Sequence, residues 1–452
     1  HPNNIVPFPT LKATSANGTG FVEKRKLALG FMPLTDCAPL VVALEHGFFS
    51  KQGLDVTLSR ESSWANIRDK VATGMLDGDQ MLAAMPLAST LNASRGQPMV
   101  TSLSLDLNGN AITVSKEIYG RMLTATSLDI ETPLGALALK QVIDANQAAG
   151  RPQLSFATVF PESSHNLLMR YWMASAGIDP DRDVRLIVVP PPQMGNYLRA
   201  GVIAGYCVGE PWNTYAVTEG LGRTLLTSRD IWNNHPEKVL GVTRIWAQTN
   251  PNTHQALVTG LIDACIWLDD INNRREACQL LSAGRYVNAP ADVLEKSLTG
   301  TLQLSSDQPP RAAPDFNIFH RYAANFPWRS HALWFISQML RWGLIDRAIK
   351  PETLAAAVYR PEVYRAAAAR LGIQCPQIDY KSEGLHAGEW TLANGESQLL
   401  MGADLFMDGR AFDPEDLIGY LAGFSQSHMT VTLDALATAI EGNRGGFLNT
   451  AG

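Results

Sequence analysis

Two short segments of the chain carry residue types that could hold a small anion. Residues 205–212 read Gly-Tyr-Cys-Val-Gly-Glu-Pro-Trp, a strand-like run that passes through a turn into a helix. Residues 235–238 read His-Pro-Glu-Lys and bring a cation, Lys238, near the ends of predicted strands. A lysine supplies countercharge to an anion, and a glycine lets the backbone approach a ligand closely. From spacing alone, a solvated Lys238 is the more common outcome, and the adjacent Glu237 could neutralise it.

Strand-to-helix loops elsewhere in the chain offer further groups to an anion. Helix N-termini present free N–H groups and a partial positive charge, and ligands of open α/β sheets lie at the carboxyl ends of strands. Each loop alone is a weak signal, because Ser and Thr are also good helix caps. The loops are Thr35-Asp36, Ser62-Ser63-Trp64, Ser163-Ser164-His165 and Gly209-Glu210-Pro211.

Two residues in these loops have both a structural and a functional interpretation. His165 follows an N-cap pair, so it is either a surface or capping histidine or an N–H donor to an oxyanion. Trp64 stands at a helix start and is either a core residue or the flat wall of a planar ligand's pocket. Spacing alone leaves both questions open.

The elements that would position these loops alternate between strands and helices, which predicts parallel sheets covered on both faces. A long helix over 253–282 and further helices over 331–344 and 351–371 follow, with a short one ending near Gly442. Residues 301–316 are expected to form a long loop. Strands are predicted at 27–32, 54–58, 80–84, 154–160, 184–189 and 203–208, and helices at 37–46, 64–72, 166–176 and 193–200.

Composition limits the possible functions. The chain has 452 residues, 46% of them hydrophobic and 18% charged, with a formal net charge of −6. These values are typical of a globular protein with two or three domains, and they argue against nucleic-acid binding. Five scattered cysteines without a Cys-x-x-Cys pair predict buried reduced thiols, with no disulfide framework and no metal site. No apolar stretch reaches the length of a membrane span, and the start at His1 allows for a removed export signal.

Several catalytic signatures are absent from the sequence. It contains no P-loop, no His-Glu-x-x-His, no Gly-x-Ser-x-Gly and no dinucleotide-binding fingerprint. No nucleophile–base pair is visible either. We therefore expect a protein that is not an enzyme and that uses no cofactor.

Several longer sequence motifs of the chain are similar to motifs of a single protein family. The chain resembles the nitrate- and bicarbonate-binding proteins of bacterial ABC transporters over about residues 27–422, which leaves out 1–26 and 423–452. Among the words that carry the resemblance are Gly-Phe-Met-Pro-Leu-Thr-Asp at 30–36, Val-Val-Pro-Pro-Pro-Gln-Met at 188–194, Cys-Val-Gly-Glu-Pro-Trp at 207–212 and His-Pro-Glu-Lys at 235–238.

The resemblance implies an α/β, two-lobe periplasmic-binding-protein-like fold of type II, with the ligand cleft between the lobes. We expect residues 27–115 with 240–424 to form lobe I, including the C-terminal helices, and residues 116–239 to form lobe II. Residues 1–26 are expected to be an N-terminal arm or linker, and residues 425–452 a C-terminal tail.

The family pattern also implies the ligand-binding residues, which by position are Trp64, Asn110, His165, Gly209 and Lys238. The nitrate branch has a lysine where Lys238 stands, whereas the bicarbonate branch has an acidic residue and a calcium ion. Lys238 therefore favours nitrate or nitrite without a metal. The family usually has glutamine where this chain has Asn110, so the shorter amide is expected to reach the anion through water.

The expected function is that of a monomeric solute-binding protein that captures nitrate, and nitrite, for the membrane permease of an ABC transporter. This role predicts a periplasmic location or a membrane tether on the periplasmic side. The alternatives are a cytoplasmic nitrate sensor that controls an antiterminator partner, a bicarbonate-binding homologue, and an enzyme of the same fold.

Overall fold

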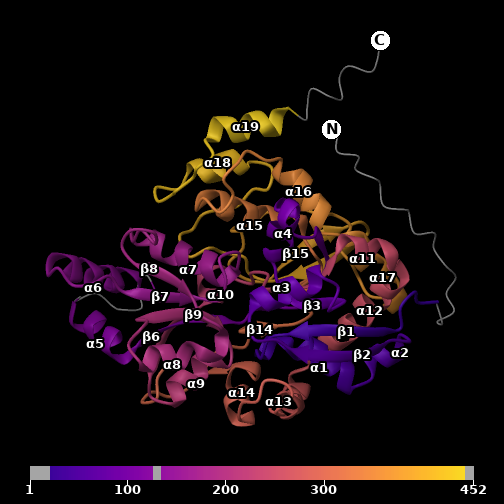
Figure 1. Ribbon diagram of the computed structural model, residues 1–452, viewed down its shortest axis with the longest axis horizontal. Helices are drawn as coiled ribbons and strands as arrows, with labels where there is room; N and C mark the ends of the chain where they lie inside the picture. The colour runs from indigo at the N-terminus through magenta and orange to yellow at the C-terminus, as the bar shows by residue number, and fades with distance from the viewer. Residues whose placement is uncertain (1–20, 126–133, 443–452) are drawn as a thin grey trace.

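Two five-stranded sheets, one in each lobe, form the framework of the molecule (Figure 1). The computed structural model describes residues 21–125 and 134–442. The first sheet has the order β2-β1-β3-β11-β4 and the second the order β10-β6-β9-β7-β8. The first sheet consists of β1 (Lys26–Phe31), β2 (Asp55–Arg60), β3 (Gly78–Leu82), β4 (Met99–Ser104) and β11 (Lys238–Thr243). The second consists of β6 (Asn110–Ser115), β7 (Ser155–Thr158), β8 (Arg185–Val188), β9 (Gly205–Gly209) and β10 (Gly222–Thr227).

Each sheet combines a parallel core with antiparallel strands. Strand β1 runs parallel to β2 and β3, and β7 runs parallel to β8 and β9, as the alternation of strands and helices predicts. Strand β11 is antiparallel to β3 and β4, and β6 is antiparallel to β9 and β10. These antiparallel strands, which the sequence did not predict, lie where the chain passes between the sheets. The structure thus confirms the α/β fold with two lobes.

The division of the chain into lobes stays a proposal, but sheet membership shifts its limits. Strand β6 belongs to the second sheet, although residues up to 115 were assigned to lobe I. Strand β11 begins at Lys238 and belongs to the first sheet, although lobe II was expected to extend to 239. We therefore place the two crossings at about 105–109 and 228–237.

The helices cover the faces of the sheets and agree with most predicted positions. Gly47 ends the first of them with a φ of 75°, the left-handed conformation that glycine adopts without strain. The first-lobe helices are α1 (Ala38–Glu45), α3 (Trp64–Ala72) and α4 (Met85–Leu91), and those of the second lobe are α5 (Lys116–Ala125), α6 (Ala136–Ala148), α7 (Ser164–Ser175), α8 (Met194–Arg199) and α9 (Trp212–Thr218).

Two long predicted helices are interrupted in the structure. The helix expected over 253–282 is divided into α12 (Pro251–Asp269) and α13 (Arg274–Leu281), where Arg274 donates hydrogen bonds to the Leu268 carbonyl. The helix expected over 351–371 is divided into α16 (Pro351–Val358) and α17 (Pro361–Leu371). Proline has no backbone N–H, so it begins a helix more readily than it continues one. The loop expected over 301–316 contains the short strand pair β12 (Thr301–Leu302) and β13 (Arg311–Ala312).

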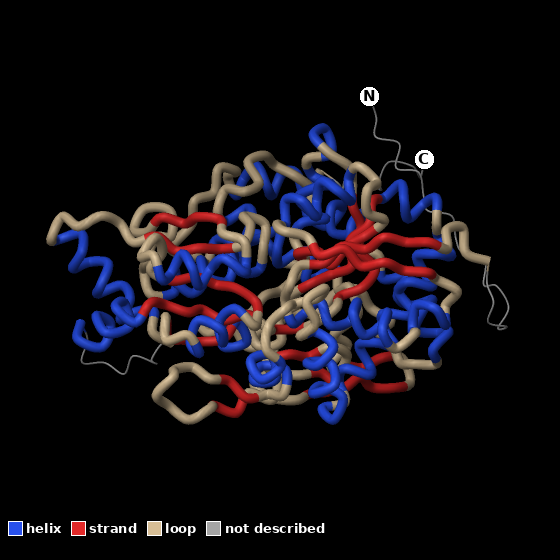
Figure 2. Tube along the Cα trace, turned by 60° about the horizontal axis from the view of Figure 1, so that its bottom comes forward, coloured by secondary structure: helices blue, strands red, loops and turns tan. Residues whose placement is uncertain are grey.

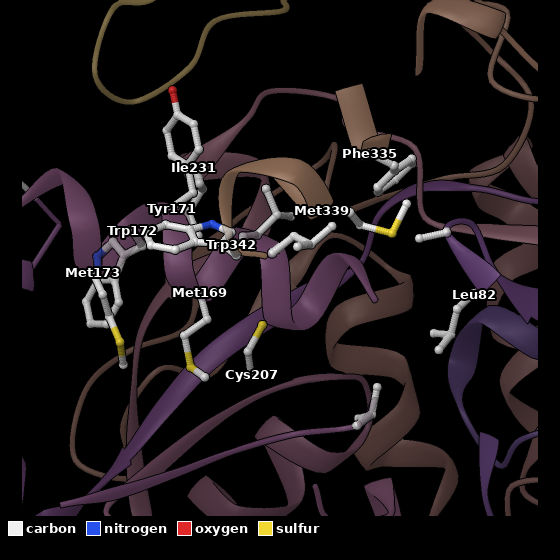
Figure 3. Close-up of a cluster of buried hydrophobic side chains, with 14 of the residues drawn as sticks. Leu82, Met169, Tyr171, Trp172, Met173, Cys207, Ile231, Phe335, Met339 and Trp342 are labelled. Atoms are coloured by element: carbon white, nitrogen blue, oxygen red, sulfur yellow. The ribbon is translucent and has the colours of Figure 1, made fainter. Parts of the chain in front are cut away.

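The C-terminal region packs against both lobes. It contains α15 (Arg329–Arg341), the hairpin of β15 (Trp390–Asn394) and β16 (Ser397–Met401), α18 (Leu417–Ala422) and α19 (Leu433–Glu441), and its helices lie along the top of Figure 1. Phe406 stacks on Trp232 with ring centroids 4.9 Å apart. Figure 2 shows the strands as separate red groups with helices and loops around them. A single buried apolar cluster extends from Met32 through Trp172 to Leu436, so apolar packing joins the lobes to this region (Figure 3).

Four of the five cysteines are buried, and all five are free thiols. None of the helices in the described ranges is long and apolar enough to cross a membrane.

Candidate functional site

All five predicted site residues lie together where the two sheets meet. Trp64 begins α3 and Lys238 begins β11 on the side of the first sheet. Asn110 begins β6, His165 lies in the first turn of α7 and Gly209 ends β9 on the side of the second sheet. All five are buried, and no side chain among them is more than 1% exposed. Residues that are distant in the sequence thus form one closed site between the lobes.

Lys238 is fully buried, which corrects the expectation of a solvated side chain in a turn. It occupies the first position of an interior strand, and its Nζ lies 2.7 Å from Asp36 Oδ2 and 2.7 Å from Glu237 Oε2. The same ammonium lies 5.5 Å from the centre of the Trp64 ring. Burial acts to lower the pKa of Lys238, but the two carboxylates outweigh it and raise the pKa, so the lysine stays charged.

The pKa values of the two carboxyl groups that hold Lys238 are shifted in opposite directions. Burial acts to raise the pKa of Glu237, but the Lys238 ammonium outweighs it and lowers this pKa to about 2. Burial raises the pKa of Asp36 above its ordinary value, with Lys238 opposing the change. Gln80 fixes Asp36 by donating to its Oδ1 at 2.5 Å, and accepts from the Met32 backbone at 3.0 Å. Glu237 is therefore the ionised partner of Lys238, and Asp36 is the group that titrates more easily.

Sequence reasoning missed three members of this site. Asp36 was noted only as part of an N-cap pair, and Glu237 only as a possible neutraliser of Lys238. Gln80 lies in the middle of a buried strand, and no local pattern distinguishes it from a core residue. Only the pairing of β3 with β1 and β11 shows that its amide reaches Asp36.

Asn110 contacts Glu237 directly. Its Nδ2 donates to Glu237 Oε1 at 2.6 Å, and the Ser164 hydroxyl donates to the same oxygen. Its other amide atom, Oδ1, is buried without a hydrogen-bond partner among the described residues. The contact of Asn110 with an anion, through water or otherwise, stays a prediction.

At this site, two buried side chains present N–H groups that no described residue accepts. They are Trp64, through Nε1, and His165, whose ring nitrogens both lack a hydrogen-bond partner, although Nε2 lies 3.8 Å from Glu237 Oε1. Burial lowers the pKa of His165 to about 3, so at neutral pH its ring is uncharged, with one donor and one acceptor nitrogen. An unsatisfied buried donor costs about 1–3 kcal/mol, and proteins rarely keep one without a reason. These groups are available to form hydrogen bonds with a polar ligand.

Gly209 brings backbone to the same place. A Cβ at this position would lie 3.3 Å from Asn110 Oδ1 and 3.9 Å from Asp36 Oδ2. A side chain here would therefore fill space beside the two polar groups. The glycine keeps that space open for close approach by a ligand.

Two sheets with a buried polar site between them match the periplasmic-binding-protein fold of type II. The chain belongs to the NMT1-like family, whose model matches residues 20–282. It is 28% identical to the periplasmic nitrate-binding protein NrtA from Synechocystis PCC 6803, whose crystal structure matches with a TM-score of 0.78 over 90% of this chain and 100% of that one.

Two longer relatives match at higher identity. The nitrate import ATP-binding protein NrtC of Synechocystis sp. PCC 6803 is 40% identical over 91% of this chain and 57% of its own length. The bicarbonate transport ATP-binding protein CmpC of the same organism is 38% identical over 91% of this chain and 56% of its own. The chain thus spans about half the length of these curated relatives.

Proposed function

We propose that the chain captures nitrate, and nitrite, as the solute-binding module of an ABC importer. The observation that carries the proposal is the pair of unaccepted, buried N–H groups of Trp64 and His165 beside the buried ammonium of Lys238. A planar oxyanion has acceptors for all three groups. The similarity to the nitrate proteins NrtA and NrtC supports this choice of anion.

The charges of the site suit a monoanion that carries no proton. Lys238 and the ionised Glu237 balance each other, and burial raises the pKa of both other carboxyl groups here, Asp36 and Asp106, so protonation of these two would leave the pocket without net negative charge. Lys238 then provides attraction, and Trp64 and His165 provide donors. Closure of the lobes excludes water and strengthens each of these contacts. The mechanism is capture and release, with no chemical step.

Titration calorimetry with nitrate, nitrite, bicarbonate and an alkanesulfonate tests this assignment. We expect one-to-one binding of nitrate and nitrite without added metal. Binding of bicarbonate only in the presence of Ca²⁺, without nitrate binding, would support the bicarbonate alternative. A response to the sulfonate alone would overturn the proposal.

Replacement of Trp64 by phenylalanine is expected to weaken nitrate binding by about tenfold, a loss of about 1.4 kcal/mol. The ring that Lys238 faces is retained, while the Nε1 donor is removed. The nitrate-free protein should lose little stability, because a buried donor without a partner disappears. Calorimetry and thermal unfolding measure the two effects. A matched change at Trp328, a buried tryptophan that faces Lys381, should leave nitrate affinity unchanged.

Nitrate affinity is expected to rise as the pH falls toward the pKa of Asp36. Burial already raises that pKa above 3.8, and a bound anion nearby favours the protonated carboxyl further. The nitrate affinity therefore rises by up to about tenfold for each unit that the pH falls. This rise is expected between the pKa that Asp36 has with nitrate bound and the lower pKa that it has without nitrate. His165, with a pKa of about 3, stays neutral in this range. Calorimetry between pH 8 and pH 5 checks the slope, which Asp36→Asn should flatten; a slope of the opposite sign contradicts the assignment.

A second candidate function follows from the longer relatives. The chain shares 40% identity with a protein named for ATP binding, yet the sequence itself has no P-loop. The shared portion is therefore an anion-binding module, and it could report nitrate to the transporter's ATPase from the cytoplasmic side. A reporter fused to the gene's natural reading frame distinguishes the roles, since export supports capture and cytoplasmic retention supports sensing.

A further inference from the structure

A buried arginine outside the anion site, Arg341, has no ion-pair partner of its own among the described residues, because the nearby carboxylate of Asp408 pairs with Arg410. Arg341 ends α15 and is only 3% exposed. Its Nε donates to the Gln426 carbonyl at 2.9 Å and its Nη1 to Gln338 Oε1 at 3.3 Å, and neither acceptor is charged. Among the residues that the structure describes, no carboxylate forms an ion pair with it. Burial lowers its pKa to about 10, so the guanidinium is still charged at neutral pH.

Arg341 lines a cavity of about 170 Å³ that also contains a second guanidinium, that of Arg410. The carboxylate in this cavity, Asp408, is already engaged: it accepts from the Tyr171 hydroxyl at 2.7 Å and pairs with Arg410 Nε at 3.2 Å. Two cations therefore face one anion, which leaves a net positive charge. A buried cation without a partner is costly, so a bound anion would stabilise this region.

The walls of the cavity are partly aromatic. The Arg341 guanidinium lies 3.7 Å from the centre of the Phe424 ring, and that of Arg410 lies 4.7 Å from it. Figure 3 shows the phenol oxygen of Tyr171 pointing out of the apolar cluster. This hydroxyl donates to Asp408, and both residues line the cavity. Ser175 and Ser425 add hydroxyl groups. The cavity volume of about 170 Å³ is far more than the about 10–15 Å³ that one water molecule needs on this measure, so it has room for a small organic ion.

We propose that this cavity binds a small organic carboxylate. The carboxylate group would accept hydrogen bonds from the guanidinium groups of Arg341 and Arg410, whose planar forks match its geometry. The carbon body would lie against the rings of Phe424 and Tyr171. The site is separate from the nitrate pocket and does not depend on the identity of the anion bound there.

Helix α7 connects the two sites. It carries His165 in its first turn and Tyr171, Ala174 and Ser175 farther along. The cavity is completed by α15 and by residues 408–425 of the C-terminal region, which packs on both lobes. An occupant would contact both α7 and this region.

The test is calorimetry of the full chain with succinate, glutarate, benzoate and sodium sulfate at matched ionic strength. We expect at least one carboxylate to bind with a Kd of about 1 mM or lower and sulfate to bind at least about tenfold more weakly. Arg410→Gln should weaken carboxylate binding by about tenfold or more, since it removes a charged fork. Its side chain is 37% exposed, so the variant should still fold.

Two further variants make the outcome decisive. Arg341→Lys keeps the charge but loses the fork and should also bind the carboxylate more weakly. Arg347→Gln, on a side chain that is 53% exposed outside the cavity, should bind it like the wild type. Failure of all three carboxylates to bind, equal binding of sulfate, or wild-type affinity in both Arg410→Gln and Arg341→Lys would overturn the proposal.

Discussion

Replacement of Lys238 by glutamine is expected to abolish nitrate binding and to lower the free energy of unfolding by about 3–5 kcal/mol at neutral pH. In the proposed site the ammonium is the charged group that faces the anion, and it also bridges Asp36 and Glu237 at 2.7 Å each. Without it, two carboxyl groups share a buried space with no cation. The pKa of Glu237, which Lys238 holds at about 2, must then rise. The variant should therefore recover stability as the pH falls and the carboxyl groups become protonated.

Chemical unfolding from pH 8 to pH 5, with calorimetry using nitrate at each pH, measures both effects. Lys381 provides a matched control, because it is another nearly buried lysine that pairs with a carboxylate, Glu383, and lies over a tryptophan ring, that of Trp328. Lys381→Gln should lose stability while its nitrate affinity stays that of the wild type. If Lys238→Gln instead binds nitrate normally, the ammonium has no role in capture.

The fold was largely predictable because local signals and tertiary contacts agree. The helix predicted at 64–72 has those bounds, since Ser63 accepts a hydrogen bond from the Asn66 N–H and caps it. The strands that alternate with helices along the chain begin and end within a few residues of their predicted limits. The antiparallel strands β6 and β11 were missed, because they receive their hydrogen bonds from strands distant in the sequence and do not follow the strand–helix alternation.

The site was predictable only where the family pattern supplied it. Trp64, Asn110, His165, Gly209 and Lys238 meet as that pattern implies, although spacing alone placed Lys238 in solvent. The carboxylates were not assigned, because a buried ion pair depends on which strands are neighbours and not on local sequence. Asp36 and Lys238 are 202 positions apart, yet Lys238 Nζ lies 2.7 Å from Asp36 Oδ2. The raised pKa of Asp36 likewise follows from burial, which the sequence does not show.

Replacement of Lys238 by glutamate is expected to make the site depend on a bound Ca²⁺ ion in place of the lysine ammonium. The substitution would place a third carboxylate beside Asp36 and Glu237, in a site whose side chains are at most 3% exposed. Clustered carboxylate oxygens are the ligands that Ca²⁺ prefers, and no buried ammonium would remain to neutralise them. The variant should fail to bind nitrate and should be strongly destabilised when calcium is removed with a chelator.

Calcium at about 100 times its Kd would restore about 2.7 kcal/mol of this loss, because a ligand that binds only the folded state stabilises it by mass action. Thermal unfolding with Ca²⁺, with Mg²⁺ and with chelator measures the effect, and bicarbonate titration in Ca²⁺ tests the exchange of anion that the family resemblance implies. Lys238→Met, which adds no oxygen ligand, should unfold at the same temperature with and without Ca²⁺. An equal response of Lys238→Glu and Lys238→Met to Ca²⁺ would place the metal elsewhere. Such a result would also contradict the proposal that residue 238 determines whether the anion binds alone or together with a metal ion.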